Sequence, residues 1–257
     1  MNKIHQTAII DPKAKLGENI TVGPYCLIGK DVSLGDNCIL DSNVLIHGKT
    51  TIGSNNHFFH SAVIGTAPQD LKYKDEPTQL LMGNNNTIRE FVTINCSATL
   101  EESTRVGSNN LIMAYAHIAH NCQFGNNIIM ANAVNLAGHV HIHDFVTIGG
   151  MTAVAQFIRI GTFAYVGGSS GATKDIPPYT RGLGLPYKVN GINSIGLKRK
   201  GFSAEQINSV RKIFKLFYFS GLNVSQAMEK VLEIPKITPE QNVFINFIKH
   251  SIKGICK

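Results

Sequence analysis

An apolar residue recurs at every sixth position through about two thirds of this chain. From Ile4 to Val166 the frame has 28 positions, of which 26 are apolar, and only Asp70 and Glu76 interrupt it. A period of six fits neither an α-helix nor one long strand. It is typical of a solenoid in which three short strands, joined by corners, form a triangular coil of about 18 residues. The sequence therefore predicts an all-β solenoid, a parallel β-helix of hexapeptide repeats shaped as a triangular prism.

The columns beside the apolar frame are patterned as well. The residue after the apolar position is glycine 12 times, which predicts tight corners with unusual backbone angles. The fourth residue after it is usually small or β-branched, as at Ala116, which predicts a second inward position with limited room. We therefore interpret Cys26, Cys38 and Cys122 as small core residues.

Composition narrows the classes of partner and compartment. Five cysteines without a C-x-x-C pair predict neither a disulfide framework nor a cysteine zinc site. A formal charge of +7 indicates anionic partners, but no helix-turn-helix, zinc-finger or RNP-type motif favours nucleic acid. No apolar run is long enough for a transmembrane segment, and the first residues lack a signal-peptide pattern. We expect a cytoplasmic protein.

The regular pattern has two interruptions and one end. Residues 66–80 are polar and proline-bearing and residues 95–105 are polar and charged, so both are predicted loop insertions. The β-helix domain is predicted over residues 1–186 and a small α-helical domain over residues 187–257. Within the latter, SAEQ (203–206) and TPEQ (238–241) are capping-box sequences that predict helix starts. We expect these helices to cap one end of the solenoid.

The sequence AHIAHNC (116–122) supplies the strongest candidate for chemistry. With 18 residues per coil, Gly138 lies one coil beyond His120, and His139 lies one coil beyond Asn121. His117, His120 and His139 are therefore predicted to share one surface beside a bare glycine backbone. This arrangement suits general-base catalysis of acyl transfer, because an imidazole can take a hydroxyl proton while a backbone N–H binds the developing oxyanion.

Two other readings stay open at this point. The run HVHIH (139–143) adds imidazoles, so a zinc hydratase is an alternative, although alternate residues of a strand point the same way rather than converge. A structural or surface-binding β-helix would instead show repetitive exposed columns and no insertions. We interpret six other histidines as solvated imidazoles on the wall of the solenoid: His5, His47, His57, His141, His143 and His250.

Several motifs in order resemble one family. HIAHNC, LAGHV (136–140), IGGMTAVAQF (148–157), PQDLKY (68–73), DIPPY (175–179) and GLKRKGF (196–202) resemble the UDP-N-acetylglucosamine O-acyltransferases, the first enzymes of lipid A biosynthesis in Gram-negative bacteria. The likeness covers essentially the whole chain. It implies a left-handed β-helix, assembled as a homotrimer with active sites between neighbouring prisms. It also implies transfer of a 3-hydroxyacyl chain from acyl carrier protein to the 3-hydroxyl of UDP-N-acetylglucosamine, with no metal or bound cofactor.

The resemblance assigns roles by position. It implies that His120 is the catalytic base and that the Gly138 backbone N–H forms the oxyanion hole. It implies that Gly168 lies where residue size limits acyl length, so that a glycine leaves room for a long chain. The implied substrate-binding residues are Asp70, Lys72, His117, His139 and Gln156, with Asn193 and Arg199 near the nucleotide and its phosphates.

Four positions depart from the family pattern. Asn121 stands where an aspartate that helps orient the base is expected, and an amide stabilises an imidazolium less well than a carboxylate does. Ala155 replaces a histidine, and Pro186 and Ile195 replace a histidine and a glutamate. The alternative activity is therefore N-acylation of a nucleotide-linked amino sugar, such as the 3-amino analogue, with an acyl carrier protein or coenzyme A donor.

Overall fold

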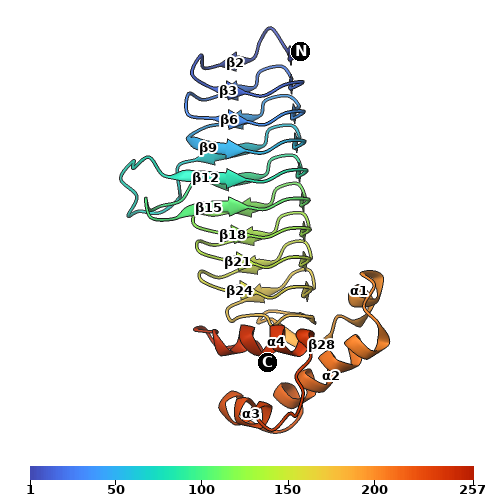
Figure 1. The fold of residues 1–257 in the computed structure, drawn as a ribbon. Helices are drawn as coiled ribbons and strands as arrows, with labels where there is room; N and C mark the ends of the chain where they lie inside the picture. Colours follow the sequence, from blue (N-terminus) through green and yellow to red (C-terminus); the bar gives the residue numbers. More distant parts are fainter.

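The computed structural model describes all 257 residues as a tall stack of coils followed by four helices. The N-terminus lies at one end of the stack, and the helices gather at the other end (Figure 1). The fold class is the predicted one, a left-handed parallel β-helix with a helical tail.

Three sheets form the walls of the prism, and most strands are only two residues long because a corner follows at once. The strands of the first sheet, in spatial order, are β1 (Lys3–Ile4), β4 (Thr21–Val22), β7 (Ile39–Leu40), β10 (His57–Phe58), β13 (Thr87–Ile88), β16 (Leu111–Ile112), β19 (Ile129–Met130), β22 (Thr147–Ile148), β25 (Tyr165–Val166), β27 (Thr180–Leu183) and β28 (Lys188–Ile192). Those of the second sheet are β2 (Ile9–Ile10), β5 (Leu27–Ile28), β8 (Leu45–Ile46), β11 (Val63–Thr66), β14 (Thr93–Asn95), β17 (His117–Ile118), β20 (Asn135–Leu136), β23 (Ala153–Val154) and β26 (Gly171–Ala172). Those of the third sheet are β24 (Arg159–Ile160), β21 (His141–Ile142), β18 (Gln123–Phe124), β15 (Ser103–Val106), β12 (Gln79–Met82), β9 (Lys49–Ile52), β6 (Ser33–Leu34) and β3 (Lys15–Leu16). All pairs are parallel except β27–β28.

The register explains why the six-residue frame survives its interruptions. Regular coils pair residues 18 apart, as in Ile4 with Val22. Ile52 pairs with Met82, 30 residues on, so the first insertion adds twelve residues. Ile94 pairs with Ile118, 24 residues on, so the second adds six. Both insertions are whole hexads, and the inward frame therefore resumes unchanged. Leu100 also occupies a position of the six-residue frame. It lies in the second insertion, however, and is 58% exposed rather than part of the core.

The frame residues and the small column together fill the prism with one continuous core of 43 buried residues. Cys26, Cys38 and Cys122 belong to it, which confirms their interpretation as small core residues. Burial raises the pKa of the Cys122 thiol to about 12, so this side chain is a neutral packing group at neutral pH.

Of the twelve glycines in the column that follows the apolar frame, only Gly65, with φ 76°, adopts the unusual backbone angles that were predicted. At Gly17 and Gly35 the backbone does not need a left-handed conformation. A Cβ at Gly35 would lie 2.6 Å from the Gly53 carbonyl carbon of the next coil, so glycine is required by the close stacking of coils. The left-handed corner falls two residues later and is occupied mostly by residues other than glycine, such as Asn37 with φ 57° and Tyr25 with φ 59°.

The tail contains α1 (Ser194–Arg199), α2 (Ala204–Tyr218), α3 (Val224–Val231) and α4 (Pro239–Lys249). The capping boxes predicted at Ser203 and Thr238 are present. The helices have their own core of 13 buried residues. The first sheet continues through β28 to Ile192, so the predicted domain boundary at residues 186/187 lies inside the β27–β28 hairpin. None of the four helices has the length and hydropathy of a membrane span.

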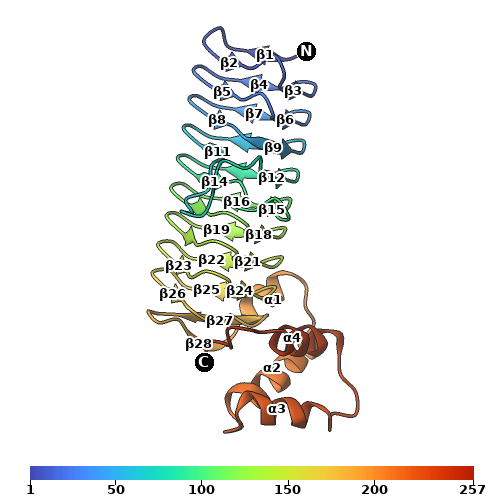
Figure 2. The ribbon, with the colours of Figure 1, turned by 90° about the vertical axis from the view of Figure 1, so that its left-hand side faces the viewer.

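The tail covers the last coil of the solenoid. Figure 2 shows the helices below the final coils and extending to one side. Asp175 is 1% exposed and forms a β-bridge with Ile255, so the chain end pairs with the last coil. Arg159 of β24 donates to the His250 carbonyl oxygen at 2.9 Å. These contacts satisfy backbone groups that would otherwise form an open edge.

Candidate active site

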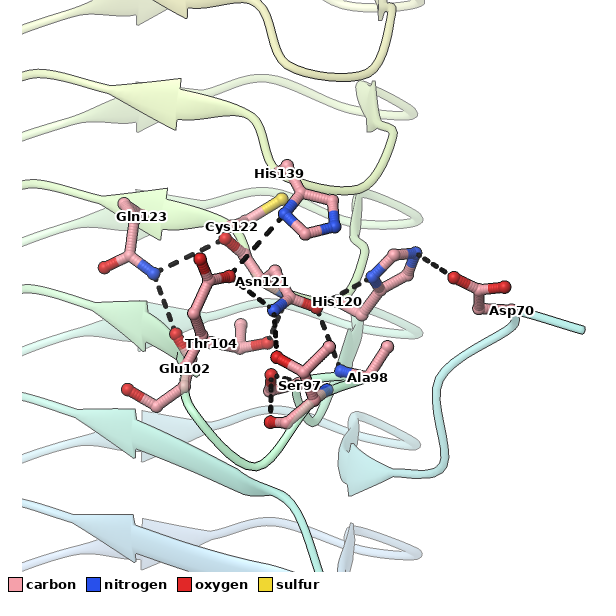
Figure 3. Close-up of polar contacts among 12 residues, drawn as sticks. Asp70, Ser97, Ala98, Glu102, Thr104, His120, Asn121, Cys122, Gln123 and His139 are labelled. Atoms are coloured by element: carbon pink, nitrogen blue, oxygen red, sulfur yellow. Dashed lines mark hydrogen bonds and ion pairs between the residues drawn. The ribbon is translucent and has the colours of Figure 1, made fainter. Parts of the chain in front are cut away.

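The side chains of interest meet at one corner of the prism, where β17 turns into β18. His120 lies in this corner, and the corner of the next coil, with Gly138 and His139, lies beside it. The first insertion brings Asp70 toward the imidazole from one side, and the second insertion brings Ala98 and Glu102 from the other (Figure 3). The site therefore combines a rigid periodic wall with two loops that interrupt the periodicity.

Hydrogen bonds fix the tautomer of His120. Its Nδ1 lies 2.9 Å from Oδ1 of Asn121, which also accepts the Ala98 backbone N–H at 2.9 Å. The Asn121 amide nitrogen donates to a Glu102 carboxylate oxygen at 2.7 Å, so the amide cannot be flipped without losing both contacts. Oδ1 must then accept from His120, and Nδ1 carries the proton. Nε2 is left with a lone pair, as a general base requires.

Gly138 lies directly against the catalytic candidate. A Cβ added at this glycine would lie 2.6 Å from Nε2 and 2.5 Å from Cε1 of His120, closer than any real side chain approaches. The Gly138 N–H donates to no backbone acceptor within the chain. The prediction that His120 lies against a bare glycine backbone is therefore confirmed geometrically, and the N–H of this glycine is not used in the backbone hydrogen bonds of the coil.

Asp70 faces the same nitrogen. Its carboxylate oxygen lies 3.9 Å from Nε2 of His120, which is beyond hydrogen-bond distance. The other oxygen accepts the Lys72 backbone N–H at 2.9 Å, which holds the carboxylate in place. The Lys72 side chain itself is exposed. The lone pair of Nε2 is thus free, and a carboxylate stands across the space that a substrate hydroxyl would enter.

The two neighbouring histidines lie as the coil arithmetic predicted. The His139 ring is 5.3 Å from that of His120 and stacks on Phe157 at 4.7 Å. His117 is half-buried, and its Nδ1 lies 2.7 Å from the Thr93 hydroxyl. Burial, followed by the proximity of His120, lowers the pKa of both His117 and His139. Both imidazoles are therefore neutral hydrogen-bonding groups around neutral pH.

The remaining predicted residues lie elsewhere on the single chain. Gln156 is exposed on the coil beyond Gly138. Asn193 and Arg199 line a cavity of about 530 Å³ between the first sheet and α1, which contains none of the residues around His120. Asn193 also caps α1 through Gly196 N–H. Gly168 lines another cavity, of about 390 Å³, beside β27 and β28.

The four residues that depart from the family pattern also lie in different parts of the structure. Ile195 lines the same cavity as Asn193, whereas Pro186 lies in the hairpin between β27 and β28. Ala155 directly follows β23, one residue before Gln156, and packs against the solenoid core. Only Asn121 is in direct contact with His120.

Sequence reasoning did not find Glu102. Its carboxylate bonds Asn121 at 2.7 Å and lies 3.6 Å from Nδ1 of His139. The second insertion stands out in the sequence, but a glutamate in a charged loop carries no signal of where it will point. No three His, Cys, Asp or Glu side chains of the chain are arranged to hold a metal ion. The chemistry that this arrangement supports is proton abstraction from a hydroxyl beside an oxyanion donor.

Comparisons with known proteins point to the same chemistry. A family model described as UDP N-acetylglucosamine O-acyltransferase, domain 2, matches residues 175–256. An acyl-(acyl-carrier-protein)–UDP-N-acetylglucosamine O-acyltransferase of Herminiimonas arsenicoxydans is 47% identical over 262 residues, covering 100% of both chains. One of Thermodesulfovibrio yellowstonii is 48% identical over 259 residues with the same coverage. The structure of LpxA from Acinetobacter baumannii superposes with a TM-score of 0.94 at 42% identity, covering 99% of each chain.

Proposed function

This chain belongs to the UDP-N-acetylglucosamine O-acyltransferase family, and from that premise we propose that it acylates the 3-hydroxyl of UDP-N-acetylglucosamine. The proposed donor is a 3-hydroxyacyl chain on acyl carrier protein, and the reaction is the first step of lipid A biosynthesis. The observation that supports the mechanism is that His120 Nε2 occupies the space where a side chain at position 138 would lie, so that only glycine fits beside it.

The residues suggest one sequence of proton and bond changes. His120 Nε2 takes the proton of the 3-hydroxyl while the oxygen attacks the thioester carbonyl carbon. The carbonyl oxygen becomes an oxyanion and accepts the Gly138 N–H. Collapse of the intermediate forms the ester and breaks the C–S bond. The imidazolium returns its proton to the departing thiolate of acyl carrier protein.

The substrate-binding roles follow the same geometry. Asp70 and Lys72 on the first insertion, with His117 and His139 on the wall, surround the position of the sugar hydroxyl in this proposal. The neutral state of the two histidines suits hydrogen bonds to sugar hydroxyls. Gln156 lies one coil further along the same surface.

We also propose a homotrimer. The support is that Asn193 and Arg199, whose proposed partners are the nucleotide and its phosphates, line a cavity separate from the His120 corner. A neighbouring chain that presents this cavity to the corner would complete one site from two subunits. A formal charge of +7 suits the anionic nucleotide and an acidic carrier protein. A cytoplasmic location remains a prediction of the sequence.

The assay that tests the proposal uses two acceptors and two donors. Purified protein is incubated with UDP-N-acetylglucosamine or its 3-amino analogue, and with 3-hydroxyacyl carrier protein or 3-hydroxyacyl coenzyme A. We expect the fastest turnover with UDP-N-acetylglucosamine and the carrier protein. Preference for the 3-amino acceptor would instead establish the N-acyltransferase alternative. Turnover that requires stoichiometric zinc would contradict the proposed mechanism.

Substitution at Gly168 tests the proposed role in acyl length. A Cβ at this position would point toward the preceding coil, 3.1 Å from the Gly150 carbonyl oxygen, so a methionine side chain would occupy wall surface that the glycine leaves open. We expect Gly168→Met to reduce kcat/KM for long acyl donors by about tenfold or more relative to short ones, since lost methylene burial is worth ~0.8 kcal/mol per CH₂. A series of acyl carrier proteins with different chain lengths provides the measurement. An unchanged length profile would remove Gly168 from this role.

A further inference from the structure

We infer that Glu102 is a positioning residue for His120: it acts through Asn121 and supplies from the second insertion the negative charge that the neighbouring amide lacks. This inference rests on the proposed role of His120 as the base. It concerns a residue that does not touch the substrate in the proposed reaction.

A continuous line of hydrogen bonds joins Glu102 to His120. His120 Nδ1–H donates to Asn121 Oδ1 at 2.9 Å, and Asn121 Nδ2–H donates to Glu102 Oε2 at 2.7 Å. Figure 3 shows the three side chains in line, with Asn121 between the imidazole and the carboxylate. The amide is polarised from both ends, because its nitrogen faces an anion and its oxygen faces a donor. Charge on Glu102 therefore strengthens the acceptor that holds the imidazole.

Burial and further hydrogen bonds hold the Asn121 side chain in this orientation. It is 1% exposed, and its backbone N–H donates to the Thr104 hydroxyl at 2.9 Å. Its Oδ1 also accepts the Ala98 N–H. Asn121 is thus hydrogen-bonded to one residue on each side of Glu102, the Ala98 backbone N–H and the Thr104 hydroxyl. The six additional residues of the second insertion carry the glutamate to this position.

The positive charge that His120 acquires during the proposed reaction must be stabilised by a nearby negative charge. When His120 takes a proton it becomes an imidazolium, and its direct neighbour is a neutral amide. The titratable groups that face it are Asp70, Glu102, His117 and His139. Asp70 faces Nε2 on the substrate side, and the neutral imidazoles of His117 and His139 supply no negative charge. Glu102 is the carboxylate connected to the Nδ1 side. Its side chain is 55% exposed, so solvent screens its charge and the effect is moderate.

The test removes the negative charge of Glu102 while its hydrogen bond with Asn121 is kept. In Glu102→Gln the new side-chain oxygen can still accept from Asn121, but the charge is gone. We expect kcat to fall about tenfold with little change in KM, because a charge-assisted bond is about twice as strong as a neutral one. The acid limb of the pH profile should move to lower pH. Glu101→Gln, the adjacent and exposed carboxylate of the same insertion, is the matched control and should behave as wild type.

Reversing the polarity of the pair provides the rescue. When Glu102→Gln is combined with Asn121→Asp, the new amide at position 102 can donate to the new carboxylate at position 121, so the same bond forms with the charge moved next to His120. We expect this double variant to recover at least wild-type kcat. Persistence of the Glu102→Gln defect in the Asn121→Asp background would overturn the inference, since it would place the effect on His139 or on loop folding. Wild-type kcat in Glu102→Gln alone would also overturn it.

A measurement independent of turnover separates this inference from the proposed function. The ring ¹⁵N chemical shifts of His120, followed by NMR against pH, report its tautomer and titration midpoint whatever the substrate is. We expect the Nδ1–H tautomer in the wild type and a lower midpoint in Glu102→Gln. A midpoint that does not move refutes the role of Glu102 even if UDP-N-acetylglucosamine is turned over. A shifted midpoint in a protein that does not acylate this acceptor upholds Glu102 and refutes the proposed function.

Discussion

Replacing His120 with alanine is expected to reduce kcat by about 10²–10⁴-fold, because the reaction loses the group that removes the hydroxyl proton. The lone pair of Nε2 is free, and the nearest carboxylate, Asp70, is 3.9 Å from it. Steady-state turnover of UDP-N-acetylglucosamine with 3-hydroxyacyl carrier protein provides the measurement.

The fold is expected to survive this change. In the alanine variant Asn121 keeps its bonds to Ala98, Thr104 and Glu102, so the corner remains tied to the second insertion. His47→Ala is the matched control, because His47 is also an imidazole packed on a glycine of the neighbouring coil but follows β8, three strands away from β17 in the same sheet. We expect it to retain activity. A folded His120→Ala protein with near wild-type kcat would refute the general-base mechanism.

Gly138→Ala is expected to have the second-largest effect, a loss of about 10²-fold or more in kcat. The added Cβ would lie 2.6 Å from Nε2 of His120, so the imidazole must move out of its position. A displacement of about 1 Å at a reacting group costs about 10²-fold, and an oxyanion donor that moves with the backbone costs a similar factor. The loss should appear in kcat/KM measured with both substrates.

This variant should fold, which makes the result interpretable. The Gly138 backbone does not occupy the left-handed region, so alanine is strained only by the His120 ring. Gly29→Ala is the control, with a new Cβ 3.0 Å from the ring of the exposed His47, which can rotate away. Circular dichroism and thermal unfolding compare the two. Full activity in folded Gly138→Ala would show that His120 does not act from its observed position.

Much of the site could be predicted because it is periodic. Once the coil length is known, Gly138 must lie against His120 and His139 beside Asn121, whatever the side chains are. The structure has this arrangement, with the His120 and His139 rings 5.3 Å apart. The burial of Cys26, Cys38 and Cys122 could be predicted in the same way, since the position of a residue in the repeat determines whether it points inward.

The sequence pattern identified the glycine positions correctly, but most of these glycines are required by the close packing of neighbouring coils and not by unusual backbone angles. Glycine after the apolar position was expected to adopt unusual backbone angles, but Gly35 is there because the next coil leaves no room for a Cβ. Asn37, two residues later, takes the left-handed conformation instead. A repeat pattern reveals that a position is constrained, but not whether a dihedral angle or a neighbouring backbone constrains it.

The sequence by itself determined the solenoid, its inward-facing core columns and the placement of Gly138 one coil beyond His120. These follow from a period that fixes the relative position of every residue on the wall. Only the tertiary structure decided where Asp70 and Glu102 point, that Asn121 connects Glu102 to the imidazole, and that Asn193 lines a separate cavity. The two insertions and the helical tail have no repeat, so their side chains are placed by individual hydrogen bonds and packing contacts between residues distant in sequence.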